Sequence, residues 1–349
     1  MNQLRRLYPL AAFLGGFAWD ALTIGQRVRV IDLWRLGAFL LGAGLLVFWL
    51  AARERRQAVA PDDGAGWRGR LRWQAPYLLM QFFFGGIFSA LFILYLKSAA
   101  HLGTWLMALL LGALLVGNEF VGKQYGRRFT LTWALFALNA ILLFNFALPH
   151  AIGSLHPLWF YVSTAAGIIL THALWRLVPG QPGRIFPAWA VSAVLLLAWG
   201  LDMIAPVPLV KQDLAVGHDF SQQSGRYVLQ VEPAPAWQFW RDQAPTLRVA
   251  AGERLYGVSA VFAPRGVTAG LEHRWEIREA GGWRLVSRNA FQSTGGRERG
   301  FRGYSWVNSP QAGEWRFIVA TQDGRTIGIL PLQIERASAP PGARIVREF

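Results

Sequence analysis

The sequence predicts an α-helical, polytopic membrane domain of about seven spans, followed by an all-β, immunoglobulin-like sandwich domain. Apolar runs separated by short basic loops fill the first 205 residues, and apolar and polar positions alternate after them. A membrane-spanning helix needs about 20 apolar residues, and a two-residue alternation is typical of a half-buried strand. The composition agrees, because 53% of the 349 residues are hydrophobic and only 16% are charged.

The membrane domain, residues 1–205, contains the seven apolar segments. They are residues 7–25, 33–52, 75–96, 102–120, 129–149, 158–178 and 185–205. The first segment follows Arg5 and Arg6 and so resembles a signal peptide, but Trp19 and Asp20 stand where cleavage requires small residues. We therefore expect a retained first span; cleavage would leave six.

The loop charges predict the orientation of the spans. With the N-terminus in the cytoplasm, most loop arginines and lysines lie on the cytoplasmic side, as the positive-inside rule requires. The loop between His150 and His156 contains no basic Lys or Arg and is assigned to the opposite side. After seven spans, the C-terminal domain lies outside the cytoplasm.

The net charge of +15 and the absence of cysteine exclude several classes of function. The excess of positive charge is concentrated in the loops of the membrane domain, so it indicates membrane orientation and not a nucleic-acid partner. A chain without cysteine has no disulfides, no thiolate metal sites and no cysteine nucleophile.

Beyond the last span, the sequence predicts a linker over 206–225, a β-sandwich over 226–336 and a flexible tail over 337–349. The expected strands are 227–232, 247–250, 254–262, 272–278, 283–291, 303–308, 314–321 and 326–334. Asp323-Gly324 between two alternating runs predicts a hairpin. Short strands at this spacing favour an antiparallel, immunoglobulin-like sandwich. Residues 237–242 break the alternation, which suggests a short helix or a segment that docks on the membrane.

Short motifs in both domains resemble one family. They are GFAWDALT from Gly16, QFFFGGIFS from Gln81, YLKS from Tyr95, GNEF from Gly117, HRW from His273, Ser305, GEWR from Gly313, DGR from Asp323 and IG from Ile327. Together they resemble bacterial integral membrane proteins with a C-terminal domain of unknown function 2914. The resemblance implies a bacterial envelope protein, and it brings no established activity, substrate or catalytic residue.

Four polar residues in the apolar runs form one candidate site: Asp20, Asn118, Glu119 and His172. A charge in the bilayer is costly, so it usually faces a partner or a water-filled cavity. Pairing between helices or at the interface, for example of Glu119 with Arg128, is the favoured interpretation, and a functional cluster is the alternative. No metal-binding spacing accompanies His172, so neither a metal nor a cofactor is expected.

A second candidate site lies in the sandwich: Arg274, Arg302, Trp306, Arg316 and Arg325. One interpretation is a solvated, arginine-rich face around core tryptophans. The other is a surface that binds an anionic glycan, a lipid headgroup or a protein partner, since arginine binds carboxylate and phosphate with two parallel hydrogen bonds. No serine stands in a nucleophile elbow, so hydrolase activity is not expected.

These features favour a non-enzymatic, multi-pass inner-membrane envelope protein, with a cytoplasmic N-terminus and a periplasmic sandwich that recognises a protein or a glycan. Its expected partners are the lipid bilayer and an envelope protein or glycan, with no nucleic acid. The alternative is a membrane-embedded transporter or lipid-processing enzyme that uses Asp20, Glu119 and His172. No internal repeat of the transporter kind supports this alternative.

Overall fold

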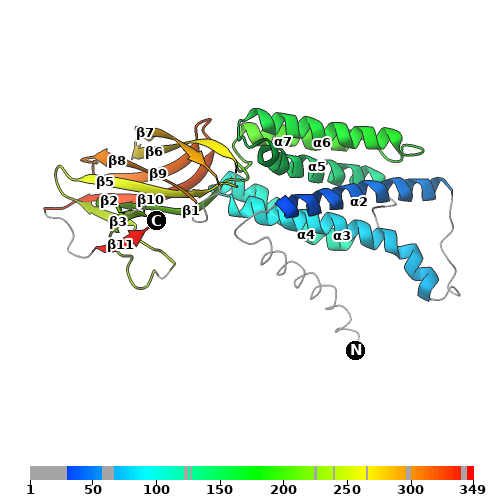
Figure 1. The fold of residues 1–349 in the computed structure, drawn as a ribbon, viewed down its shortest axis with the longest axis horizontal. Coiled ribbons are helices and arrows are strands. Elements are labelled where there is room, and N and C mark those ends of the chain that lie inside the picture. The colour runs from blue at the N-terminus through cyan, green and yellow to red at the C-terminus, as the bar shows by residue number, and fades with distance from the viewer. Residues whose placement is uncertain are drawn as a thin grey trace. The chain divides into compact units, whose positions relative to one another are not determined.

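The structure is a computed structural model that describes residues 30–56, 67–121, 125, 128–223, 226–238, 240–264, 266–295, 300–338 and 344–349. The chain divides into two compact units (Figure 1). The first consists of Met1–Leu96, Gly103–Ala151 and Pro157–Ile204. The second consists of Lys97–Leu102, Ile152–His156 and Ala205–Phe349.

The first unit is helical, as its apolar runs predict. Its described helices are α2 Val30–Arg55, α3 Trp67–Lys97, α4 Leu102–Val121, α5 Phe129–Ile152, α6 Leu158–Leu177 and α7 Phe186–Gly200. Of these helices, α2 to α6 are long and apolar enough to cross a membrane, whereas α7 is a shorter apolar helix of 15 residues. The prediction of seven spans is therefore not supported, since five described helices reach spanning length and residues 7–25 lie outside the described part.

Two helix boundaries differ from the prediction by five residues or more. Helix α3 begins at Trp67, eight residues before the apolar segment, because the arginine-rich stretch before Pro76 is also helical. Helix α7 ends at Gly200 and not at Ala205, because Asp202 has a φ of 55° and leaves the right-handed helical region.

Glycines allow close approach inside the helical unit. A Cβ atom on Gly86 of α3 would lie 2.7 Å from the Phe39 ring of α2. A Cβ atom on Gly167 of α6 would lie 2.8 Å from the backbone of Ile141 on α5. Small residues at helix contacts let the backbones approach in this way.

The second unit is built from eleven described strands in three sheets (Figure 1). The sheet of five has the order β4-β10-β9-β6-β7, the first sheet of three is β1-β5-β8, and the second is β11-β3-β2. Their bounds are β1 Val210–Gly217, β2 Asp219–Gln223, β3 Arg226–Val231, β4 Thr246–Val249, β5 Arg254–Phe262, β6 Thr268–Glu279, β7 Gly282–Thr294, β8 Phe301–Asn308, β9 Gly313–Thr321, β10 Thr326–Arg336 and β11 Ile345–Glu348. The described pairs are antiparallel except β4 with β10.

Two hydrophobic clusters hold the sheets together. The larger joins the sheet of five to β1-β5-β8 and includes Trp275, Phe317 and Val307. The smaller joins β1-β5 to the β11-β3-β2 sheet and includes Leu229 and Phe349. The unit is thus a sandwich with a third, smaller layer over one sheet.

All eight expected strands are present, and Gly324, with a φ of 95°, lies in the turn between β9 and β10 as the Asp-Gly pair predicts. Three expectations are wrong. Residues 206–225 are not a plain linker, because they contain β1 and β2; β2 is mostly polar, and β1 ends in four consecutive buried residues, so neither strand alternates. The tail 337–349 is not wholly flexible, because β11 pairs with β3. The helix interpretation of 237–242 is wrong, because its described residues form turns and bends; docking on the membrane stays a prediction, with Trp237 and Trp240 exposed.

Gly257 of β5 provides a test of the sandwich core. A Cβ atom there would lie 2.5 Å from the Phe317 ring and 2.8 Å from Trp275. Because overpacking a filled core costs about 1–3 kcal/mol, we expect Gly257→Ala to lower the unfolding free energy of the sandwich by that amount. Hydrogen exchange of the full-length protein in nanodiscs measures this change in the β5 and β6 amides. Gly281→Ala, with nothing near its added Cβ atom, is the matched control and should change little.

Candidate functional site

Asn118 and Glu119 belong to a hydrogen-bond network between helices. Asn118 Nδ2 donates to the backbone oxygen of Gln81 at 2.9 Å, and Gln81 Nε2 donates to Glu119 Oε2 at 3.0 Å. The buried Tyr125 hydroxyl donates to Asn118 Oδ1, and Thr132 Oγ1 donates to the backbone oxygen of Tyr125 at 2.8 Å. The network joins α3, α4 and α5, which agrees with pairing between helices. Among the described residues, Gln81 is the hydrogen-bond partner of Glu119, and residues 122–124 and 126–127 of the basic loop lie outside the described part.

His172 has different partners. Trp189 Nε1 of α7 lies 3.3 Å from His172 Nδ1, and Arg176 Nε lies 3.4 Å from His172 Nε2. A neutral imidazole has one acceptor nitrogen, so only one of these donors can be bound at a time. The described contacts of His172 thus lie on α6 and α7, apart from those of Asn118 and Glu119, and Asp20 lies outside the described residues. The four residues predicted as a cluster are not brought together in the described part.

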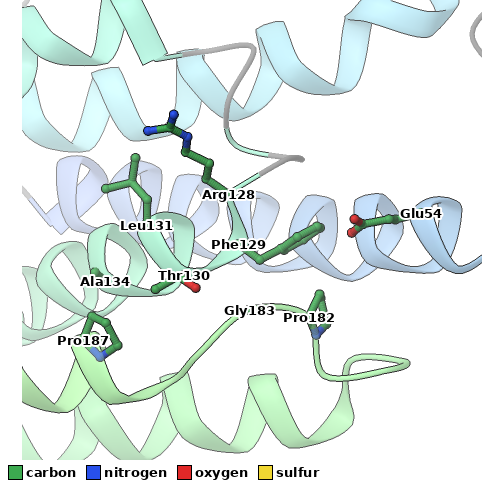
Figure 2. Close-up of a pocket in the computed structure, with 9 residues that line it drawn as sticks. All are labelled: Glu54, Arg128, Phe129, Thr130, Leu131, Ala134, Pro182, Gly183 and Pro187. Carbon is green, nitrogen blue, oxygen red and sulfur yellow. The ribbon is translucent and has the colours of Figure 1, made fainter.

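A pocket of about 720 Å³ opens at the start of α5 and the loop before α7 (Figure 2). It contains one acidic and one basic residue among apolar and small ones: Glu54, Arg128, Phe129, Thr130, Leu131, Ala134, Pro182, Gly183 and Pro187. Thr130 Oγ1 accepts a hydrogen bond from the backbone N–H of Arg184 at 2.9 Å, so this hydroxyl has a structural partner. None of the predicted site residues lines the pocket.

The predicted arginine surface of the sandwich is divided between two sheets. Arg316 of β9 donates from Nε to Glu276 Oε2 at 2.6 Å, and Arg274 of β6 lies 3.5 Å from the carboxylate of Glu272. Both glutamates are buried. A third arginine, Arg325 in the β9–β10 turn, lies 3.7 Å from Asp323. These arginines therefore neutralise the charge of carboxylates in the same domain. This favours the interpretation of this part of the surface as an arginine-rich face and not as a binding site.

Arg302 and Trp306 lie on β8 in another sheet, and they share one face with Tyr304 and Asn308. The burial of β8 alternates, with Gly303, Ser305 and Val307 inside and residues 304, 306 and 308 exposed. The paired strand β5 places Arg254 opposite Asn308 and Tyr256 opposite Trp306. We call this set the β8 strip: Arg254, Tyr256, Arg302, Tyr304, Trp306 and Asn308.

The aromatic rings of the β8 strip are ordered by their neighbours. Phe220 of β2 stacks on Tyr304 with ring centroids 4.4 Å apart and an interplanar angle of 20°. The Trp306 ring is 6.2 Å from that of Tyr304 and inclined by 26°. Tyr304 remains 41% exposed and Trp306 43% exposed, so both rings offer surface to a ligand. The sequence prediction missed Tyr304, although the two-residue period of a strand places it between Arg302 and Trp306.

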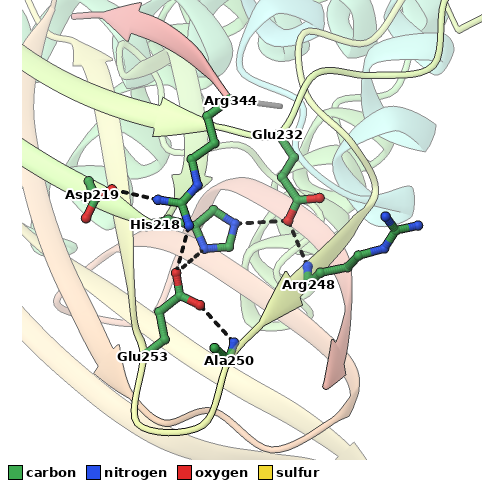
Figure 3. Close-up of polar contacts among 7 residues, drawn as sticks. All are labelled: His218, Asp219, Glu232, Arg248, Ala250, Glu253 and Arg344. Atoms are coloured by element: carbon green, nitrogen blue, oxygen red, sulfur yellow. Dashed lines mark hydrogen bonds and ion pairs between the residues drawn. The ribbon is translucent and has the colours of Figure 1, made fainter. Parts of the chain in front are cut away.

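A buried histidine joins two glutamates at one corner of the sandwich (Figure 3). His218, between β1 and β2, lies with Nε2 2.9 Å from Glu232 Oε1 and with Nδ1 2.8 Å from Glu253 Oε1. The backbone N–H of Arg248 donates to Glu232 at 2.7 Å, and that of Ala250 donates to Glu253 at 2.8 Å. Each ring nitrogen of His218 therefore lies within hydrogen-bond distance of a carboxylate oxygen.

Arg344 completes this corner from the C-terminal segment. It donates to Glu253 Oε1 at 3.1 Å and to Asp219 Oδ2 at 2.7 Å. Through these two ion pairs, Arg344 makes this corner an ion-pair network. The described residues contain no group of three or more acidic or histidine side chains suited to a metal ion. The network connects the ends of β1, β3, β4 and β5 to the C-terminal segment. The sequence did not predict it, because its members are far apart in the chain.

A serine–histidine set lies in the core of the sandwich. Ser259 Oγ is 2.7 Å from His273 Nε2, and Ser305 Oγ is 3.1 Å from His273 Nδ1 and accepts a hydrogen bond from Trp275 Nε1. Burial lowers the pKa of His273 to about 3, so the ring is neutral at physiological pH. His273 and Ser259 are fully buried, so no substrate reaches them and their role is structural.

No family model and no curated protein matches the chain. Among solved structures, it is similar to an immunoglobulin-like protein from Pseudomonas aeruginosa, with 10% identity over 35% of this chain and 97% of that one and a TM-score of 0.20. It is also similar to the CARDB domain of a Pyrococcus furiosus protein in complex with di-metal ions, with 9% identity over 35% of this chain, 88% of that one and a TM-score of 0.20. With TM-scores this low, neither likeness bears on ligand or activity, and the sandwich is defined by its own strand pairing.

Proposed function

We propose that this chain is a non-enzymatic bacterial inner-membrane protein whose β-sandwich lies in the periplasm and recognises an envelope protein or a glycan. We also propose, from the motifs in both units, that it belongs with the membrane proteins that end in domain of unknown function 2914. The apolar helices are compatible with a membrane protein that carries a β-sandwich.

One observation carries the proposal. The β8 strip combines exposed aromatic rings with arginine and asparagine side chains on one face of a sheet. Aromatic and arginine side chains dominate binding surfaces, because they offer large contact areas and several hydrogen-bond donors. On the sheet of five, Arg274 and Arg316 pair with the buried carboxylates of Glu272 and Glu276.

The membrane-embedded alternative finds less support. The described contacts of Glu119 and His172 lie on different helices, and the Ser259–His273 pair is buried in the core of the sandwich. The proposal therefore places molecular recognition on the sandwich, with the helices as its membrane anchor.

Native mass spectrometry of the gently solubilised full-length protein tests this assignment. We expect a retained protein or glycan that is lost in Trp306→Ala and kept in Glu119→Gln. A lipid or small molecule that is kept in Trp306→Ala and lost in Glu119→Gln would overturn the proposal and move the activity into the helical unit.

A further inference from the structure

We propose that the β8 strip binds a saccharide that carries carboxylate groups, with the sugar rings stacked on Tyr304 and Trp306. This inference rests on the proposed function and names the ligand class of its binding surface. It follows from the order of the side chains along the strand, the rigidity of the rings and the sign of the charge around them.

The order along β8 suits an extended ligand. Side chains two residues apart on a strand point to the same face at a spacing of about 6.6 Å. The face of β8 therefore presents Arg302, Tyr304, Trp306 and Asn308 in a row, and β8 is an edge strand in the described β1-β5-β8 sheet. Aromatic side chains thus occupy the middle of the row and polar side chains its two ends.

The rings offer surfaces that sugars bind. One side of a pyranose ring presents C–H groups, which pack on the negative face of an aromatic ring, while its hydroxyl groups stay at the edge. Phe220 stacks on Tyr304 at 4.4 Å and fixes the ring before any ligand arrives. A surface that is already ordered loses little conformational entropy on binding.

The polar groups at the ends of the row favour an anionic ligand. Arg254 Nε donates to Asn308 Oδ1 at 2.8 Å, and Arg254 Nη1 lies 3.4 Å from the Tyr256 hydroxyl. These two hydrogen bonds orient the guanidinium group. Because a guanidinium has five N–H donors, three of them take no part in these two bonds. Arg302 supplies positive charge at the other end of the row.

The charge of the β8 strip favours an anionic ligand. The outward positions of β8, and the positions of β5 opposite them, contain no Asp or Glu. Opposite Tyr304 and Arg302, β5 places the buried residues Val258 and Ala260, so the exposed part of this face is aromatic and polar. Tryptophan, tyrosine and arginine are enriched in protein interfaces as well, so binding of a defined saccharide must separate the two kinds of partner. Two rings between arginines match an amphipathic, carboxylate-bearing sugar chain.

The test measures binding of short oligogalacturonate to the full-length protein in nanodiscs, with the fully methyl-esterified oligomer as its neutral counterpart. Isothermal titration reports both affinities. We expect the wild type to prefer the anionic oligomer. Trp306→Ala should weaken its binding about tenfold or more, since a lost stacking contact removes about one power of ten in affinity.

Two further variants separate charge from stacking. Arg254→Gln should weaken binding of the anionic oligomer and leave binding of the methyl ester unchanged, because only the carboxylates interact with the guanidinium charge. The controls are Trp240→Ala, an exposed tryptophan outside the strip, and Arg278→Gln, an exposed arginine 5.6 Å from the Trp283 ring on the other sheet. Both controls should bind as the wild type does.

Two results would overturn the saccharide assignment: wild-type protein that binds neither oligomer, or binding that Trp306→Ala leaves unchanged. A protein partner that is lost in Trp306→Ala, without any saccharide binding, would refute the saccharide and leave the proposed recognition function standing. If Trp306→Ala changed neither saccharide binding nor binding of a protein partner, both proposals would be refuted.

Discussion

His218→Ala is expected to lower the free energy of unfolding of the sandwich by about 3–5 kcal/mol, because removing the partner of buried carboxylates leaves their charge uncompensated. The imidazole is fully buried and lies within hydrogen-bond distance of Glu232 and Glu253. Without the ring, both carboxylates remain in a site with little access to water, where backbone N–H groups and Arg344 are their other partners among the described residues.

Hydrogen exchange of the full-length protein in nanodiscs measures this loss as reduced protection of the β1, β3 and β4 amides. Asp219→Asn is the matched control, because it removes an exposed partner of Arg344 in the same network. Exposed ion pairs contribute about 0–1 kcal/mol, so the control should differ little from the wild type. Equal protection in His218→Ala and the wild type would show that the corner does not stabilise the domain.

The second large effect is a loss of folding stability as the pH is lowered. The pKa of His273 is about 3 in the folded protein because burial disfavours the charged ring, and an unfolded histidine has a pKa of about 6.5. Between these values, the unfolded state binds more protons, so stability rises with pH and falls as the pH is lowered. The stabilisation that the neutral His273 ring contributes is complete above about pH 6.5. Below that pH, the unfolding free energy falls by an amount that approaches about 1.4 kcal/mol per pH unit.

His273→Gln removes this titration while keeping a polar side chain between Ser259 and Ser305. We expect the variant to be less stable at neutral pH and to show a smaller pH slope between about pH 6 and pH 4. A ring-proton chemical shift of His273 that stays constant from pH 8 to pH 4 in the folded wild type gives a second readout. Equal slopes in the two proteins, or a shift that titrates near pH 6.5, would contradict a buried neutral ring.

Much of the fold follows from local pattern. The apolar runs predict helices α2 to α7 within a few residues at most boundaries, because their length matches the bilayer. Alternation predicts eight strands, and 254–262 coincides with β5. Strands β1, β2 and β11 could not be predicted in this way: the partners of β1 and β11 are distant in the chain, and β2 is mostly polar.

The candidate sites depend more on distant contacts. The sequence identifies Arg274 and Arg316 as notable, but it does not reveal that Arg274 pairs with Glu272 on its own strand and Arg316 with Glu276 on the neighbouring strand. Arg302 and Trp306 were predicted as part of the same surface, and the strand period is enough to add Tyr304. The partner of Asn118 and Glu119 is Gln81, which helical periodicity cannot find because it lies on another helix.

Cysteine accessibility tests the central claim of a periplasmic sandwich most directly, because the chain contains no cysteine of its own. Two exposed positions serve as probes: Gln222 in β2 of the sandwich and Arg56 after α2. In cells with a permeabilised outer membrane, a maleimide that does not cross the inner membrane should label Gln222→Cys at once. It should label Arg56→Cys only after the inner membrane is lysed. Labelling of Arg56→Cys in intact spheroplasts, with Gln222→Cys protected, would contradict the orientation and the recognition function that depends on it.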